Sequence, residues 1–448
     1  MSTRGFFEQV REEFDAVSEA LFSALQAGED LTLNLAAEDT LFIRFNGNRV
    51  RQNTDVTQRV LSLIFHVRGR SVEQSLTLSG RQDSDRQAAA EALLRCRAEA
   101  AFLPVDPHQV ALLNNGSSEE EFRGSLLPPA QLIRMILDPA AGSDMVGLYA
   151  GGALIRANRN SKGQKHWFAT ENFFFDYSLY KGPKAVKGVY SASVWNSEDW
   201  AASLRRSREL LALLARPVQE VKPGAYRSYL APPAFADLVG MLGWDALSAA
   251  ACKQGRSPLK KLVEKDLRLS PLFSLEENFS LGLSPRFNAQ GEVAAARLPL
   301  IQEGEIAHLL VSSRSAKEYG LQANGAAEGE CPRAMDVSTG SLAQADVLAN
   351  LGTGLYLSNL HYLNWSDPMS ARVTGMTRYA CFWVQGGEIV GPIQNLRWDE
   401  SLFSALGSKL MALTQEAEIA PAVGTYFERS LGGSRTPGAL IDAFNFTL

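Results

Sequence analysis

The period of the apolar residues changes twice within the first hundred positions. Over residues 6–25 an apolar side chain recurs every three or four positions and Gly28 follows, which predicts one amphipathic helix. From residue 31 to about residue 78 the period is two, with a tight-turn signal at Asn46-Gly47, so we expect antiparallel strands. A segment rich in Ala, Leu, Gln and Arg at about 84–100 favours a second helix. The chain therefore begins as an antiparallel sheet flanked by helices.

The next hundred residues resume this pattern after an interruption. Turn-forming and acidic residues fill positions 102–127, which we interpret as a connector. Ser197 is placed to cap a helix that Pro217 ends. In order, we expect a short helix, a strand, an aromatic strand and a longer helix at about 130–137, 145–155, 167–175 and 197–216.

The second half of the chain is predicted to be mostly strand. It opens at Lys222-Pro223-Gly224, with one helix at about 233–251 and a last helix at about 401–416. Alternating segments around Gly-containing turns indicate two hairpins, at 298–311 and 380–393. We therefore predict an α+β fold with two domains: an N-terminal α/β domain with an antiparallel sheet flanked by helices, residues 1–220, and a C-terminal β-rich, barrel-like domain, residues 221–448.

Composition limits the possible classes of function. The 448 residues include 44 Lys and Arg against 49 Asp and Glu, so the chain lacks the global basic field of many nucleic-acid-binding proteins. Aromatic residues at 167–177 lie near three lysines, as on a base-stacking surface, but we favour the packing of a large sheet as their explanation. Four widely spaced cysteines are interpreted as buried thiols in a reducing compartment. Because no apolar run is long enough to span a bilayer and the first segment turns acidic, we expect a cytoplasmic protein without a membrane span.

Common catalytic motifs are missing from the sequence. It contains no G-x-S-x-G, G-x-x-x-x-G-K-[ST] or G-x-G-x-x-G, which disfavours serine hydrolases, P-loop proteins and Rossmann enzymes. Two histidines three or four positions apart on a helix could share a zinc ion, but the five histidines are widely scattered. His361, Asp367 and Cys381 are the only zinc candidates that lie near one another, and Cys381 is better explained as a core thiol.

The densest polar cluster lies at residues 359–378. On a strand, Asn359 and His361 would share one face, and Thr374-Gly375 would bring backbone N–H groups close to it. One interpretation is a peptide or carboxylate pocket with Arg378 as an anion clamp; the other is a polar loop whose Asn and Asp cap turns and whose Arg378 makes an internal salt bridge. Both stay open. The candidate peptide- or partner-facing residues are Asn359, His361, Asn364, Asp367, Thr374 and Arg378.

A series of motifs in the second half resembles the TldD/PmbA family. The order and spacing of these motifs cover about residues 222–413, and the N-terminal pattern of helix, strands and helix fits as well. The motifs are Lys222-Pro223-Gly224-Ala225-Tyr226 with Leu230-Ala231-Pro232-Pro233-Ala234, Arg286-Phe287-Asn288-Ala289-Gln290-Gly291, Ser315-Ala316-Lys317-Glu318-Tyr319-Gly320, Gly354-Leu355-Tyr356-Leu357-Ser358-Asn359-Leu360 with Val373-Thr374-Gly375-Met376-Thr377-Arg378, and Gly387-Glu388-Ile389.

The resemblance implies two domains and a partner. Members of this family pair a TldD-type chain with a TldE (PmbA)-type chain in a peptidase that acts on small peptides, including precursors of antibacterial peptides. The TldD-type chain binds zinc through a His-Glu-x-x-x-His helix and a later Cys. Here the corresponding segment, residues 238–245, has neither His nor Glu, and the acidic pair common in the next motif is Asn288 and Gln290. Both departures point to the TldE-like side of the family.

The resemblance therefore predicts a non-catalytic subunit that holds no metal or other cofactor. It would work with a zinc-bearing TldD-type partner and shape the path of an extended peptide substrate. Two alternatives remain from other classes. One is a homodimeric peptide-binding protein or metal-independent hydrolase, and the other is a regulatory protein in DNA gyrase-related processes, although the acidic charge balance disfavours contact with nucleic acid.

Overall fold

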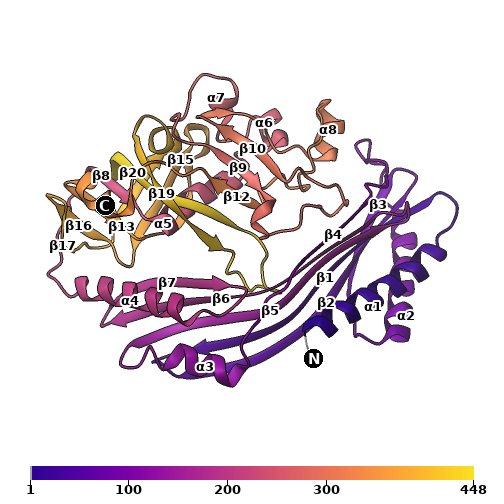
Figure 1. Ribbon diagram of the computed structural model, residues 1–448. Helices are drawn as coiled ribbons and strands as arrows, with labels where there is room; N and C mark the ends of the chain where they lie inside the picture. Colours follow the sequence, from indigo (N-terminus) through magenta and orange to yellow (C-terminus); the bar gives the residue numbers. More distant parts are fainter. Residues whose placement is uncertain (1–2, 448) are drawn as a thin grey trace.

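The computed structural model describes residues 3–447 as two β-sheets with helices packed on them (Figure 1). The first half contains α1 (Thr3–Ser23), β1 (Glu29–Phe45), β2 (Val50–Val67), β3 (Arg70–Thr77), α2 (Gln82–Ala100), β4 (Ser117–Phe122), α3 (Pro129–Leu137), β5 (Asp144–Asn160), β6 (Lys165–Lys181), β7 (Lys184–Ala192) and α4 (Ser197–Leu213). The predicted α+β fold class is confirmed.

The second half contains more and shorter elements. They are β8 (Gly224–Leu230), α5 (Pro232–Gly240), η1 (Met241–Gly243), α6 (Ala249–Lys253), α7 (Lys260–Val263), β9 (Leu275–Asn278), η2 (Phe279–Leu281), β10 (Arg297–Gln302), β11 (Glu305–Ile306), α8 (Ser313–Tyr319), β12 (Ala334–Val337), η3 (Gln344–Asp346), α9 (Val347–Leu351), β13 (Gly354–Leu357), β14 (Asn359–Asp367), η4 (Pro368–Ser370), β15 (Arg372–Arg378), β16 (Phe382–Gln385), β17 (Glu388–Pro392), β18 (Arg397–Ser401), η5 (Ser404–Ser408), β19 (Leu410–Pro421) and β20 (Gly433–Phe446). Both predicted hairpins are present, as β10–β11 and β16–β17.

The first sheet follows the order β3-β2-β1-β5-β6-β4, and β7 also pairs with β6. Side chains alternate between its two faces, because successive residues of a strand point in opposite directions. On one face Leu31, Leu33 and Leu35 of β1 are buried with α1 and α2, and further along the same face α3 and α4 pack around Trp200. The other face carries polar residues such as Asn34, which contacts the second half of the chain. The helices therefore leave one face of this sheet for the second sheet.

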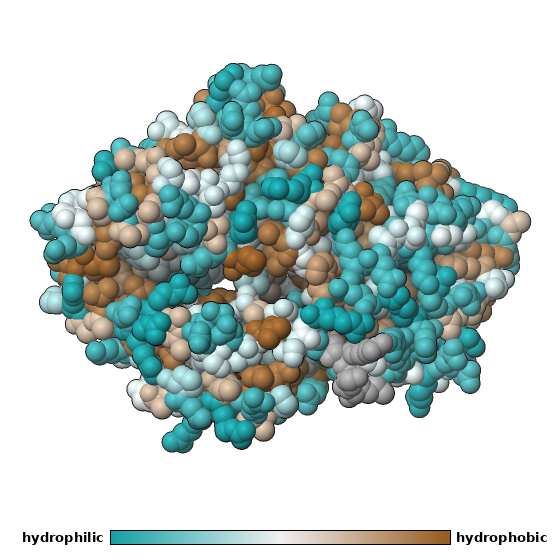
Figure 2. Space-filling view, viewed as in Figure 1, coloured by the Kyte–Doolittle hydropathy of each residue, from teal (hydrophilic) through white to brown (hydrophobic). Residues whose placement is uncertain are grey.

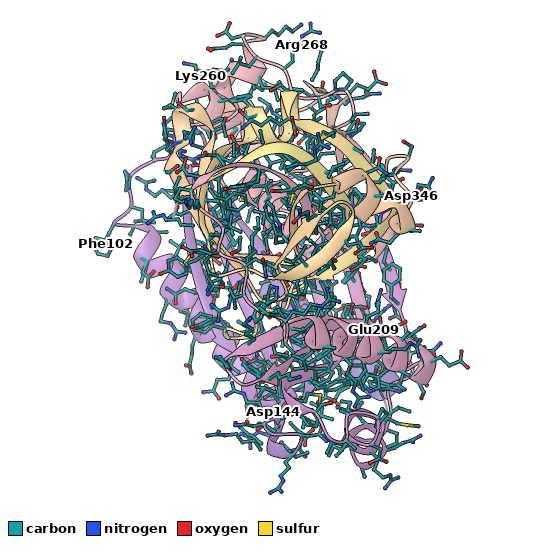
Figure 3. All side chains as sticks on the ribbon, turned by 90° about the vertical axis from the view of Figure 1, so that its left-hand side faces the viewer. Phe102, Asp144, Glu209, Lys260, Arg268 and Asp346 are labelled. Carbon is teal, nitrogen blue, oxygen red and sulfur yellow. The ribbon has the colours of Figure 1, made fainter. Side chains whose placement is uncertain are left out.

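The second sheet is built around β20, which pairs with β8, β12, β18 and β19. Its main path is β11-β10-β9-β12-β20-β8-β13-β16-β17, and β14 joins it only through β15 and β18. Phe235 of α5, Trp398 and Phe444 belong to its largest core cluster. Figure 3 shows the two halves as layers, with Asp144 of the first sheet on one side and Lys260 of the second half on the other.

Two segments have a different secondary structure from the predicted one. The predicted connector at 102–127 contains β4, which runs parallel to β6; its Glu119 and Glu121 form ion pairs with Arg11, so the acidic residues are neutralised by α1. The predicted last helix at 401–416 is wrong. A short turn of π-helix, in which Gly407 has non-helical angles, leads into β19, which pairs with β20. Pairing with β20 thus overrides the helix propensity of the segment.

Three smaller expectations also change. The helix predicted at 233–251 ends at Gly240 and is continued by separate short helices. The side chain that caps α4 is Asn196, which accepts hydrogen bonds from two backbone N–H groups, rather than Ser197. Cys96 and Cys381 are buried thiols as expected, but Cys252 is half-buried and Cys331 is exposed. Within residues 3–447 no helix has the length and apolar character needed to cross a membrane.

The two halves of the chain are in contact on either side of an opening. At one contact, the side-chain amides of Asn34 and Asn158 donate to the carbonyl of Ala289 at 3.0 and 2.9 Å. At the other, Val186 of β7 belongs to a buried cluster with Phe382 of β16. Between them Figure 2 shows a gap that passes through the molecule above β6 and β7. The second half therefore bridges the first sheet rather than covering it.

A loop between β19 and β20, residues 422–432, ties the middle of this bridge to the first sheet. The backbone N–H of Arg429 donates to the Glu38 carboxylate, and its buried guanidinium donates to the backbone carbonyl of Asn172 at 3.1 Å. In the same loop Tyr426 and Phe427 are 90% and 96% exposed. A firmly anchored loop thus holds two aromatic rings in solvent.

Candidate functional site

Five of the six sequence-predicted candidate residues share one exposed face of the second sheet. Antiparallel pairing of β14 with β15 places Asn359 opposite Arg378 and Asn364 opposite Thr374, and His361 lies between them. Paired residues of antiparallel strands point to the same side. The prediction that Asn359 and His361 lie on one face of a strand is therefore confirmed. We call this surface the β14–β15 face and define it by these five residues.

A bulge in β14 keeps Asn364 on that face. The register shifts between His361 and Asn364, and Tyr362 in the bulge has a φ of 58° with 84% of its surface exposed. An extra residue in one strand restores the alternation that would otherwise turn Asn364 inward. On the opposite side of the same ribbon Leu360 and Thr377 are buried. Apart from Met376, which lies opposite His361 and is 40% exposed, the face is polar, and the buried side of the ribbon is mostly apolar.

The sixth candidate, Asp367, has a local structural contact instead. Its carboxylate caps η4 by accepting a hydrogen bond from the backbone N–H of Met369 at 3.1 Å. Hydrogen bonds from Ser370 and Met369 lower the pKa of Asp367. For this residue the turn-capping interpretation is correct. Asp367 lies opposite Arg372, at the end of the ribbon away from Arg378, and we leave it out of the β14–β15 face because its carboxylate caps a turn.

Arg378 does not make the internal salt bridge that one interpretation expected. Among residues 3–447 no carboxylate lies within ion-pair distance of its guanidinium, which sits 5.2 Å from the ring centroid of Tyr379. Such a contact holds the side chain in place without neutralising its charge. Arg378 thus remains available to an anion from outside the chain.

Two residues that the sequence analysis missed face this surface. Asp237 of α5 accepts a hydrogen bond from the backbone N–H of Leu360 at 3.3 Å, and Lys187 of β7 forms an ion pair with Asp176 at 2.9 Å. Val186, the neighbour of Lys187, is buried with Ala380, so β7 of the first sheet lies beside the β14–β15 face, and the charge of Lys187 acts on both Asp237 and His361. Asp237 stands alone among apolar residues of its helix, a signal that could have drawn attention to it.

The surroundings of Asp237 and His361 shift the pKa of both groups. Desolvation by the surrounding protein raises the pKa of Asp237 to about 6, although the residue is exposed at the surface. Burial, followed by the positive charges of Arg378 and Lys187, lowers the pKa of His361. A carboxyl group with a raised pKa and an imidazole with a lowered one are both closer to neutral than they would be in water. The site therefore disfavours isolated charge unless a ligand compensates it.

The residues of this region do not fit a zinc site. The three sequence candidates are separated by role: His361 is on the exposed face, Asp367 caps a turn, and Cys381 is a buried thiol whose pKa is raised by burial to about 11. The part of the chain that the structure describes contains no group of three His, Cys, Asp or Glu side chains arranged to hold a metal ion. No catalytic step through a metal can therefore be derived from these residues.

The aromatic run at 167–177 is core, as we favoured. Phe173, Phe175 and Tyr177 are buried, and Tyr177 packs edge-on against Trp200 of α4. The nearby Lys165 forms an ion pair with Asp15. The alternative of a base-stacking surface is therefore wrong for these rings.

The two-sheet α+β fold defines a class of proteins with solved structures. The fold matches TldE from Thermococcus kodakarensis with a TM-score of 0.75 at 14% identity, over 94% of this chain and 97% of the TldE chain. A protein from Thermotoga maritima MSB8, described as a candidate modulator of a DNA gyrase, matches with a TM-score of 0.78 at 14% identity over 97% of this chain and all of the other. A protein of the same description from Bacteroides thetaiotaomicron matches with a TM-score of 0.75 at 15% identity over 98% and 99% of the two chains.

The sequence itself gives the family. Residues 223–448, half of the chain, match the family model described as the PmbA/TldA metallopeptidase C-terminal domain. The chain belongs to the TldD/PmbA family. No curated protein matches the sequence.

Proposed function

We propose that this chain is a non-catalytic, TldE-like subunit of a cytoplasmic peptidase, with zinc supplied by a TldD-type partner. In this assembly the opening between the sheets guides an extended peptide. The observation that carries the proposal is the β14–β15 face: a largely polar surface beside β7 of the first sheet, in a member of a metallopeptidase family whose described residues offer no metal-ligand set. Residues 1–220 and 221–448 would act as the two domains that form this opening.

A partner is favoured by an unpaired strand edge. β3 pairs with β2 only from Val60 onward, so residues 50–57 have no strand on that side within the described chain. These residues are mostly exposed on both faces. Free strand edges invite pairing with another chain.

The exposed aromatic rings support the same conclusion. Tyr426 and Phe427 are held in solvent by an anchored loop, and the carbonyl of Phe427 accepts a hydrogen bond from Gln58 of β2. The rings and the free edge are therefore close together. Two adjacent, almost fully exposed aromatic residues are typical of a surface that a partner covers.

Reconstitution tests this proposal. The purified chain is mixed with a TldD-type chain that carries His-Glu-x-x-x-His, and cleavage of an unstructured peptide is followed with each chain alone and with both. We expect cleavage only from the mixture or from the zinc-bearing chain, and a stable complex in size-exclusion chromatography. Cleavage by this chain alone, insensitive to chelators, would favour the metal-independent hydrolase instead. A stable homodimer that binds peptide and ignores the zinc-bearing chain would favour the peptide-binding protein.

A further inference from the structure

One end of the β14–β15 face carries positive charge without a matching anion. Arg378 is exposed and rests on Tyr379, with no carboxylate of the described chain paired to it. Lys187 approaches from the other sheet, and both charges act on His361. These two positive charges disfavour protonation of the imidazole, and the carboxylate of Asp176 offsets only the charge of Lys187. An anion placed among these three groups would relieve the repulsion between their positive charges.

We propose that His361, Arg378 and Lys187 form a binding site for a carboxylate of an extended peptide. The peptide nature of the ligand rests on the proposed function; the carboxylate follows from the site. A guanidinium presents two parallel N–H donors that match the two oxygens of a carboxylate. Arg378 is the main anchor, since Lys187 is already partly neutralised by Asp176 at 2.9 Å.

The neutral side-chain amide of Asn359 lies beside Arg378. Asn359 is paired with Arg378 across the two strands, and the hydroxyl of Ser358 donates to its Oδ1 at 2.9 Å. This contact turns the amide so that Nδ2, which has no acceptor among the described residues, is free for a ligand. The site thus combines the guanidinium of Arg378 with the oriented side-chain amide of Asn359.

The acidic residue at the site sets a limit on where the ligand lies. Asp237 faces the same space, and its Oδ2 is used by the backbone N–H of Leu360. A carboxylate bound close to Asp237 would meet like charge, so the ligand should bind on the Arg378 side of His361. Binding there should leave the β14 backbone contact with α5 intact.

Peptide binding to the isolated chain tests the proposal. The probes are three versions of one fluorescent, unstructured hexapeptide: with a free C-terminal carboxylate, with a C-terminal amide, and with a C-terminal amide plus an internal Glu. We expect the free acid to bind about tenfold more tightly than the neutral amide, a difference that corresponds to one charge-assisted contact. The Glu-containing amide separates the two sources of carboxylate. If it equals the free acid the site takes side-chain carboxylates, and if it equals the neutral amide the site takes the C-terminus.

Substitutions test whether Arg378 is the residue that causes the preference for the free acid. Arg378→Gln should remove the preference for the acid and leave the affinity for the neutral amide unchanged, and Arg378→Lys should restore part of it. Arg134 of α3 is the matched control, because α3 packs on the helix-covered face of the first sheet; Arg134→Gln removes one exposed cation away from this face and should change the preference less than twofold. Equal binding of acid and amide, no binding of either, or equal loss for both in Arg378→Gln would overturn the proposal. Because neither zinc nor a partner is in the assay, its failure would leave the proposed subunit role standing.

Discussion

Replacing Asn288 by Asp should destabilise the second half of the chain by about 3 kcal/mol at pH 7. Asn288 is buried, and its Nδ2 donates to the carbonyl of Ala326 at 2.8 Å and to the carboxylate of Glu292 at 2.9 Å. Aspartate keeps the acceptor for the backbone N–H groups of Gln290 and Glu292, but it loses both donors. A buried carbonyl without a donor costs about 1–3 kcal/mol. The new carboxylate would also lie against that of Glu292.

Protonation limits this penalty and gives it a pH dependence. A carboxyl group can escape the repulsion by binding a proton, which costs about 1.4 kcal/mol for each pH unit above its ordinary pKa of about 3.9, or about 4 kcal/mol at pH 7. The folded state would raise the pKa of the new carboxyl, so it would bind more protons than the unfolded state above pH 4. The stability of the variant should therefore fall as the pH rises from about 4 toward 7, which is the sign that proton linkage requires.

Urea unfolding followed by tryptophan fluorescence measures this difference at pH 5 and pH 7. We expect a loss of about 3 kcal/mol at pH 7 and a smaller loss at pH 5. Asn359→Asp is the matched control: its Oδ1 accepts from the Ser358 hydroxyl, a bond that aspartate keeps, so its loss should stay below about 0.5 kcal/mol. Equal losses for the two variants, or a loss at position 288 that grows as the pH falls, would refute the reasoning.

Three further predictions follow from the same structure. Because burial raises the pKa of Asp237 to about 6, wild-type stability should fall as the pH rises from about 4 to 6, and Asp237→Asn should remove this dependence in urea titrations. Arg429→Met should cost about 2–4 kcal/mol by leaving the Asn172 carbonyl without its donor, and hydrogen exchange should quicken in residues 422–432; unchanged exchange there would argue against the anchoring role. Changing Tyr426 and Phe427 together to Ser should weaken complex formation with the TldD-type partner at unchanged thermal stability, and a complex of full affinity would show that this loop lies outside the interface.

The sequence predicted the fold where local periodicity and tertiary structure agree. The helix at the start of the chain and the hairpins with Gly-containing turns follow from spacing alone. β4 was not predicted because a run of acidic residues is typical of a loop. In the structure Arg11 of α1 neutralises Glu119 and Glu121 and allows the strand to form. Residues 401–416 were predicted as a helix because nothing local reveals that β20 will pair with β19.

The candidate site was half predictable for a similar reason. Strand alternation placed Asn359 and His361 together, and the β14–β15 pairing added Arg378 to the same face. Asp237 and Lys187 lie more than a hundred residues from this segment, on a helix and on the other sheet. Only the way the second half packs on the first sheet brings them to the β14–β15 face, and no spacing in the sequence encodes that arrangement.

The metal content of the isolated chain tests the central claim most directly. The chain is purified without chelators, dialysed against buffer containing zinc, passed through a desalting column and examined by elemental analysis, with a zinc-bearing TldD-type chain treated in parallel. We predict that this chain retains no stoichiometric zinc, because its described residues provide no ligand set, whereas the partner retains about one ion per chain. One tightly held zinc ion per molecule of this chain would contradict the assignment of a non-catalytic subunit.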